Sequence, residues 1–270
     1  MNNNNHLSSS SLTIRLRNLR KWMIALFILV IFIWSMLGLD YQGFQSTSKV
    51  VSLSILKGFM HPDWAYVYLP EGEDLLRELL ETLVISILGT FVSAILCIPF
   101  AFWAAANMSR LRLFPGMGKF TLSVIRVFPE MIVAILFIKA VGPGSFAGVL
   151  ALGVHSIGML AKLFSETIEG IDPGPQEALI ACGATRLQTI RFAVIPQVIP
   201  QFLSYSLYRF EINIRSATTL GLVGAGGIGT PLIFALQVRN WNRVGVILLG
   251  IVLLVVVTDF ISSRLRRRII

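Results

Sequence analysis

Charged residues are scarce in this chain of 270 residues. Asp, Glu, Lys and Arg make up 14% of the sequence, whereas 55% is hydrophobic and the mean hydropathy is +0.75. A soluble domain of this length would carry about 25% charged residues. Apolar stretches of roughly 17 to 25 residues recur, and each is long enough to cross a bilayer core as a helix. We therefore expect an all-α polytopic membrane protein.

Residue types that carry chemistry are also few. The two cysteines, Cys97 in an apolar stretch and Cys182 in a polar loop, make no disulfide framework and no metal site. The three histidines, His6, His61 and His155, stand in unrelated places, which argues against a membrane enzyme. We interpret His155, inside an apolar stretch, as an interhelical hydrogen-bonding group. No GxxxxGK[ST] motif occurs, so we expect any ATPase to be a separate polypeptide.

Acidic residues are fewer than basic ones, with 14 against 23 and a net charge of +9. In a soluble protein this excess would suggest a nucleic-acid partner. Here the gathering of basic residues in cytoplasmic loops explains it, and we expect no nucleic acid. The apolar stretches predict about six spans, near residues 22–39, 80–105, 120–141, 145–161, 196–213 and 243–263.

An even number of spans places both termini on one side of the membrane. On that side we count fourteen Lys and Arg residues, against five on the other and four within spans. The termini are therefore predicted to be cytoplasmic, in a multi-pass protein of the inner or plasma membrane. The same count places the polar loop at residues 177–196 in the cytoplasm.

The expected division of the chain follows this topology. Residues 1–21 form a cytoplasmic tail, whose first thirteen residues we expect to be disordered because they are polar and low in complexity. A first anchor at 22–39 and an external segment at 40–77, with room for an interfacial helix, come next. The main transmembrane domain covers 78–263, and 264–270 form a basic cytoplasmic tail.

Residues 221–238 test the topology because they are apolar enough for a seventh span. A seventh span would place the basic C-terminus outside, and the glycines and Pro231 weaken a continuous helix. We therefore prefer a re-entrant or broken segment. Its GxGxxG match is no dinucleotide fingerprint, because neither a strand nor a βαβ unit surrounds it. We expect a hinge or gate at Gly221, Gly224, Gly226, Gly227 and Gly229.

The loop at 177–196 reads EALIACGATRLQTIRFAVIP. An acidic residue and a small residue are followed by a glycine six positions after the acid and a proline thirteen positions after the glycine. This spacing resembles the EAA loop of ABC importer permeases, through which a separate ATPase drives the membrane subunit. Leu179 and Ala193 depart mildly from the family pattern, in which a second alanine and an isoleucine are common there.

The resemblance implies roles for four residues of this EAA-like loop. The loop would form two short helices along the cytoplasmic face and insert into a groove of the ATPase. Glu177 would meet a basic residue of the partner, and Ala178 would allow a close approach. Gly183 would let the chain turn between the helices, and Pro196 suits the first turn of the next span.

A second resemblance concerns the run RSATTLGLVGAGGIGTPL at 215–232, which is similar to the glycine-rich segment of permeases for phosphonate and related oxyanions. The two resemblances together imply a type I ABC importer permease of the phosphonate and phosphite subgroup. They imply a homodimer, two ABC ATPase subunits that bind ATP and Mg, and an extracytoplasmic binding protein. They also imply no catalytic residue and no cofactor in this chain.

Two alternatives stay open at the level of sequence. The same permease fold could carry another substrate, such as an amino acid, glycine betaine or phosphate. An ion-coupled secondary transporter would need no ATPase, but it would want internal repeats and suitable carboxylates at membrane depth. The sequence offers no convincing repeat.

Five ionisable residues within or beside the spans are candidates for a substrate path, because charges at membrane depth are costly. Arg126 and Glu130 lie four apart on one expected helix and can pair, which favours a packing role. Arg209 and Glu211 lie two apart and need other partners, and Arg215 lies near the outer end. For Arg209 and Arg215 both readings stay open, because guanidinium groups also bind oxyanions bidentately. We expect Glu130 and Glu211 to be the only carboxylates in mid-span.

Overall fold

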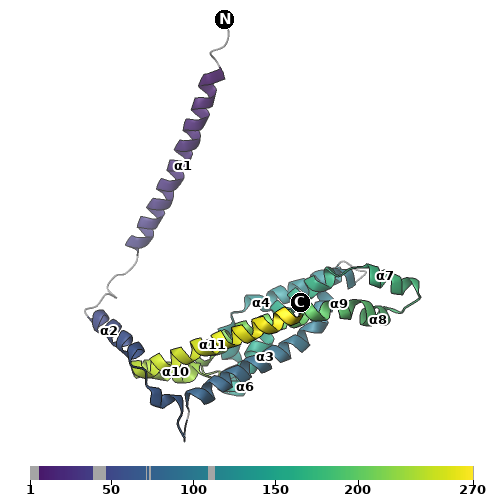
Figure 1. The fold of residues 1–270 in the computed structure, drawn as a ribbon. Coiled ribbons are helices and arrows are strands. Elements are labelled where there is room, and N and C mark those ends of the chain that lie inside the picture. The colour runs from purple at the N-terminus through teal and green to yellow at the C-terminus, as the bar shows by residue number, and fades with distance from the viewer. Residues whose placement is uncertain (1–5, 39–46, 71, 73, 109–112, 270) are drawn as a thin grey trace. The chain divides into compact units, whose positions relative to one another are not determined.

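The structure is a computed structural model that describes residues 6–38, 47–70, 72, 74–108 and 113–269. The described residues fold as helices joined by short connections (Figure 1). The helices are α1 (His6–Leu37), α2 (Thr47–Met60), η2 (Trp64–Val67), α3 (Leu75–Ala104), η3 (Ala106–Met108), α4 (Leu113–Val127), α5 (Glu130–Val141), α6 (Ser145–Glu169), α7 (Gly174–Ala181), α8 (Arg186–Thr189), η4 (Ile190–Val194), α9 (Ile195–Gly221), α10 (Gly229–Gln237) and α11 (Trp241–Ile269).

The N-terminal body of the chain contains α1, a helix of 32 residues. Its stretch Leu19–Leu37 is apolar enough to cross a membrane, and its large apolar side chains are exposed, as suits a helix facing lipid. The expected disorder of the first thirteen residues was wrong from His6 onward; residues 1–5 lie outside the described residues. No proline or glycine occurs between His6 and Leu37, so nothing interrupts the helix.

The second body begins at Ser54, and α3 and α6 form its centre. Small residues allow the two helices to approach closely: a Cβ on Gly89 would lie 2.8 Å from Cβ of Leu152. Close packing through small residues is typical of membrane helices, where apolar burial alone gives no driving force. Around this pair pack α4, α5, α9 and α11.

The all-helical polytopic architecture expected from the sequence is confirmed. Among the described helices, α1, α3, α6 and α11 are long and apolar enough to cross a membrane, and α4 with α5 forms a fifth candidate. The expected span at 196–213 is part of α9, which has 27 residues but whose polar side chains keep its apolar content too low for the same criterion. The expected external segment contains the short helices α2 and η2.

The third expected span was wrong as a single helix. It consists of α4 and α5, which meet at an angle of 81°. Pro129 directly precedes α5 with ψ of 137°, an extended conformation. Proline has no N–H to donate and its ring obstructs the preceding helical turn, so a break at this position is expected on physical grounds. The break separates Val127 from Glu130 and creates an elbow in the span.

Three helices extend beyond their expected ends. The fourth span continues to Glu169, the fifth to Gly221 and the last to Ile269. The basic residues at 264–268 are therefore the final turns of α11 rather than a separate tail. Their positive charge suits the negative end of the helix dipole, and no helix breaker precedes them.

The segment 221–238 is broken, as the sequence analysis preferred. Its first glycine, Gly221, closes α9, a loop covers 222–228, and α10 has nine residues. At 1.5 Å per residue α10 spans about 14 Å, less than half of a bilayer core. In Figure 1 α10 lies at one end of this helical body, whereas α7 and α8 lie at the other.

Candidate functional site

The EAA-like loop forms two short helices, α7 and α8, that leave the body at one end (Figure 1). Glu177 lies in the first turn of α7, and both it and Ala178 are exposed. Gly183 turns the chain between the helices with φ of +81°, a conformation that favours glycine. Pro196 lies in the first turn of α9. The two short helices and the turn agree with the local geometry that the resemblance implies, and the coupling role of the four residues stays a prediction.

The loop is anchored to the helical body at both of its ends. Arg186, the first residue of α8, donates from Nη2 to the carbonyl oxygen of Met108 in η3. At the loop's entrance, the backbone N–H of Asp172 donates to Oε1 of Gln197 over 3.1 Å. Gln197 lies on α9, and the π-helical turn η4 joins α8 to α9 without a break. A displacement of the loop would therefore be transmitted directly to α9.

The surface of the loop is partly apolar. Ile180 on α7 is 57% exposed and Leu187 on α8 is 77% exposed. None of the residues of α7 is buried in this chain. Exposed apolar side chains next to an exposed carboxylate are typical of a surface that packs against a partner.

The glycine-rich segment lies in a close-packed loop at the opposite end. Gly224, Gly226 and Gly227 have φ of +93°, +82° and +73°. A Cβ on Gly221 would lie 2.7 Å from Cα of Gly229, so both positions exclude any side chain. The hinge or gate role of these five glycines stays a prediction. The structure requires glycine at three of them because φ is positive, and at Gly221 and Gly229 because the two backbones lie too close for a side chain.

Two residues that hold this loop were missed by the sequence analysis. Oε1 of Glu81 accepts a hydrogen bond of 3.0 Å from the N–H of Gly227 and one of 2.5 Å from Oγ of Ser145. Oγ1 of Thr82 accepts one of 2.8 Å from the N–H of Ile228. Glu81 lies within the second expected span, and a carboxylate in an apolar stretch is the signal that would have found it.

The expected pairing of Arg126 with Glu130 was wrong, because the elbow places them on different helices. Within the described residues no ion pair joins them. Oε2 of Glu130 instead accepts a hydrogen bond of 2.9 Å from Ser216 on α9 and lies 3.9 Å from Nε2 of His155 on α6. Arg126 is exposed, and its Cγ lies against Gly158 of α6, where an added Cβ would be 2.8 Å away.

The buried Arg209 donates from Nε to Oγ of Ser156 on α6 over 2.8 Å. Ser156 also donates to Oδ1 of Asn213 over 3.2 Å, and Asn213 donates to Oγ1 of Thr90 on α3 over 2.8 Å. A polar network thus crosses the centre of the bundle between α3, α6 and α9. At 3.9 Å, His155 and Glu130 are too far apart for a hydrogen bond, so the interhelical hydrogen-bonding role expected for His155 stays a prediction.

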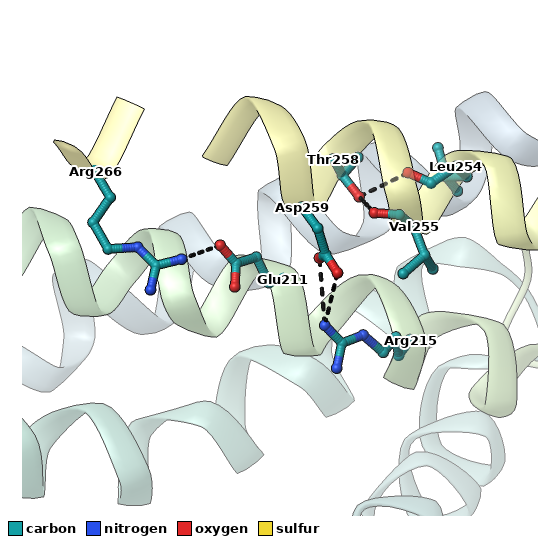
Figure 2. Close-up of polar contacts among 7 residues, drawn as sticks. All are labelled: Glu211, Arg215, Leu254, Val255, Thr258, Asp259 and Arg266. Carbon is teal, nitrogen blue, oxygen red and sulfur yellow. Dashed lines mark hydrogen bonds and ion pairs between the residues drawn. The ribbon is translucent and has the colours of Figure 1, made fainter. Parts of the chain in front are cut away.

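Two ion pairs join α9 to α11 (Figure 2). Glu211 pairs with Arg266, and Nη2 of Arg215 lies 3.2 Å from Oδ2 of Asp259. As expected, Glu211 does not pair with Arg209. The expectation that Glu130 and Glu211 are the only carboxylates in mid-span was wrong, because Asp259 lies within α11 and Glu81 within α3. The sequence already contained this signal in the run VVVTDFISS.

These positions divide the five candidate path residues into two groups. Arg126, Glu130 and Arg209 lie around the elbow, next to α6. Glu211 and Arg215 face α11 and hold it against α9. Within the described residues no group of three His, Cys, Asp or Glu side chains could hold a metal ion.

A family profile identifies the chain. The family described as "Binding-protein-dependent transport system inner membrane component" matches residues 76–270, which include α3 to α11. The chain belongs to this family. It is an inner-membrane permease subunit of an ABC importer, and such a subunit carries no catalytic centre of its own. A binding-protein-dependent ABC system also contains an ATPase and a binding protein as partners.

Several similar proteins are described as phosphite or phosphonate permeases. The phosphite transport system permease protein PtxC of Stutzerimonas stutzeri is 44% identical over 192 residues, which cover 71% of this chain and 70% of that protein. The putative phosphite permease HtxC of the same organism is 37% identical over 75% of this chain and 74% of its own length. PhnE2 of Escherichia coli K12, a putative cryptic phosphonate permease, is 48% identical over 45% of this chain and 99% of its length.

Solved structures agree with the fold. The permease has a TM-score of 0.63 with a chain of the inward-facing MetNI methionine ABC transporter, at 21% identity over 73% of this chain and 96% of that one. A chain of a bacterial importer of alginate gives a TM-score of 0.58 at 17% identity over 95% of this chain and 99% of that one. The fold of a type I ABC importer permease, inferred from the EAA-like loop, is therefore confirmed.

Proposed function

We propose that this permease imports phosphonate- and phosphite-type oxyanions into the cytoplasm. The observation that carries the proposal is the 44% identity with a phosphite permease over 70% of that protein's length. The arginines of the elbow support it, because guanidinium groups bind tetrahedral oxyanions through paired hydrogen bonds. Phosphate is the second candidate substrate, favoured by similarity to the phosphate-import permease PhnE of Mycolicibacterium smegmatis, which is 37% identical over 74% of this chain and 37% of that protein.

The assembly that we propose is a homodimer of this chain with two ABC ATPase subunits and an extracytoplasmic binding protein. ATP and Mg bind to the ATPase subunits, and the permease itself needs no cofactor. Arg126 supports a path at the dimer interface, because this arginine is exposed on the surface of a membrane-embedded helix. A charge at membrane depth must face protein or a water-filled path.

The coupling surface that we propose is the EAA-like loop. Ile180 and Leu187 would enter a groove of the ATPase, and Glu177 would pair with a basic residue at its edge. The anchors of Arg186 and Gln197 support this role because they make the loop a rigid extension of α9. ATP binding would then move α9 and the helices packed against it, in a cycle of alternating access.

An uptake assay tests the substrate and the loop together. Cells that lack the gene should regain uptake of radiolabelled phosphite and methylphosphonate when it is restored, with phosphate as a third substrate. Gly183→Arg should abolish uptake while the protein still inserts in the membrane, since position 183 requires positive φ and lies on the exposed turn. Glu177→Lys should have the same effect.

A second glycine provides the matched control. Gly116 on α4 is exposed, has open space around it and has an ordinary φ, so Gly116→Arg should retain uptake. Normal uptake by both Gly183→Arg and Glu177→Lys would contradict the role of the loop. Restoration of phosphate uptake without phosphite or methylphosphonate would replace the proposed substrate by the second candidate.

A further inference from the structure

A group of polar side chains lies at the elbow between α4 and α5. We call Glu130, His155, Ser156 and Arg209 the elbow cluster. Arg209 is 4% exposed, and besides Ser156 it contacts Sδ of Met159 from Nη1 over 3.4 Å. Within the described part of the chain no carboxylate lies within 4.0 Å of this guanidinium. A buried cation without an ion pair is costly, and no carboxylate of the described residues lies close enough to pair with Arg209 directly.

Three atoms of the elbow cluster are buried and lack a hydrogen-bond partner in the described structure. They are Nη2 of Arg209, Nδ1 of His155 and Oε1 of Glu130. The three groups interact electrostatically, since Glu130 acts on both His155 and Arg209. An unsatisfied buried polar atom is costly, and native structures contain few of them. Three in one neighbourhood therefore indicate a missing ligand.

The unsatisfied atoms specify the chemistry of that ligand. Nη2 of Arg209 donates, Nδ1 of His155 donates when it carries the proton, and Oε1 of Glu130 accepts. A phosphorus oxyanion that carries one proton presents both P–O⁻ oxygens, which accept, and a P–OH group, which donates. A fully ionised anion such as sulfate has no proton for the carboxylate and would be repelled by it.

We propose that the elbow cluster is the membrane-embedded subsite for a singly protonated phosphorus oxyanion. Arg209 and His155 bind its P–O⁻ oxygens, and Glu130 accepts the hydrogen bond of its P–OH group. This inference rests on the proposed function and goes beyond it, because it assigns binding atoms in the permease and a protonation state of the substrate.

The position of the elbow cluster suits a site on a transport path. The side chains of Glu130 and His155 are each 19% exposed, so the cluster lies just beneath the surface of the protein. Val127 and Phe128 at the elbow are 77% and 51% exposed, which places the elbow itself on that surface. Arg126 is exposed, packs against Gly158 of α6 and adds positive charge next to the elbow cluster. Broken helices of this kind form ion and substrate sites in many transporters.

The amount of oxyanion transported per ATP hydrolysed tests the subsite. The complete complex of permease, ATPase and binding protein is reconstituted in proteoliposomes, and phosphite uptake and ATP hydrolysis are measured together. Arg209→Gln should lower phosphite transported per ATP about tenfold or more, since a hydrogen bond to a charged group is lost. Glu130→Gln should lower it as well, whereas Arg209→Lys keeps the charge and should restore part of the loss.

Arg243→Gln is the matched control for this assay. Like Arg209, Arg243 has a buried nitrogen without a partner, but its guanidinium lies over the ring of Tyr66 at 4.2 Å, away from the elbow. Its substitution should leave the ratio unchanged. A merely structural role of Arg209 would lower uptake and ATP hydrolysis together and leave their ratio unchanged, which would overturn the subsite.

Two further outcomes separate the subsite from the proposed function. If the Arg209→Gln variant does not insert into the membrane, the Glu130→Gln variant tests the subsite instead. This substitution keeps the shape of the side chain, and the glutamine can still accept the hydrogen bond from Ser216. An unchanged ratio in Glu130→Gln would then overturn the subsite. If the unaltered complex transports no phosphite and no methylphosphonate, the proposed function fails first and the subsite falls with it.

Discussion

At the scale of single residues, steric demand and conformation separate glycines that look equivalent in the sequence. Gly224 and Gly227 both have positive φ, but their surroundings differ. A Cβ on Gly227 would lie 2.6 Å from Oγ1 of Thr82, whereas one on Gly224 would meet only Cβ of Pro143 at 3.9 Å. The sequence predicted that these glycines matter as a set, but it could not rank them, because the ranking depends on α3.

The ranking gives a prediction for stability. Gly224→Ala should cost about 1–2 kcal/mol, the penalty of positive φ for a residue with a Cβ. Gly227→Ala should cost more, because it adds a clash with Thr82 and displaces the hydrogen bond between Gly227 and Glu81. The measurement is thermal unfolding of the purified permease in detergent. Equal midpoints for the two variants would contradict the packing described for this loop.

At the scale of elements, α9 connects the EAA-like loop with the glycine-rich loop. It begins directly after the EAA-like loop, carries Arg209 to the elbow cluster and ends at the glycine-rich loop. The pairs that Glu211 and Arg215 form with α11 hold these two helices together (Figure 2). These ion pairs suggest that α9 and α11 move as one unit when the loop is displaced.

A double-mutant cycle tests the tie between α9 and α11. Glu211→Gln and Arg266→Gln should each destabilise the permease, and the double variant should be less affected than the sum of the two. We expect a coupling energy of about 0.5–3 kcal/mol from unfolding measurements. The pair of Arg215 with Asp259 is the comparison, and its coupling should be smaller because its side chains are more exposed, 55% and 40% against 30% and 11%. Additive effects at Glu211 and Arg266 would contradict the tie.

Element boundaries show what the sequence could predict and what it could not. The EAA-like loop depends on local spacing, so its two helices and the turn at Gly183 could be predicted. The sequence analysis missed the elbow at Pro129, although the proline stands in the sequence. It relied on hydropathy, and residues 120–141 form one apolar stretch by that measure. The wrong partner was predicted for Glu130 for the same reason. Its hydrogen-bond partner, Ser216, lies 86 positions away, and only the packing of α5 against α9 brings the two together.

At the scale of the whole molecule, the family and the membrane architecture could be predicted because composition and one short motif determine them. Low charge content predicts helices that cross a membrane, and the EAA-like loop predicts that a separate subunit supplies the ATPase. The polar network of Arg209, Ser156 and Asn213 could not be predicted, since it joins three helices whose register no local pattern specifies. In the proposed function, the loop and the network are linked through α9, so that ATP hydrolysis outside the membrane would move helices within it.

The measurement that tests this account most directly is isolation of the tagged permease from its native membrane, followed by an assay of ATP hydrolysis. We predict that an ABC ATPase co-purifies with the permease and that the preparation hydrolyses ATP. Gly183→Arg should lose both the ATPase and the activity, whereas Gly116→Arg should keep them. Oxyanion uptake by the purified permease alone, driven by an ion gradient without ATP, would contradict the account.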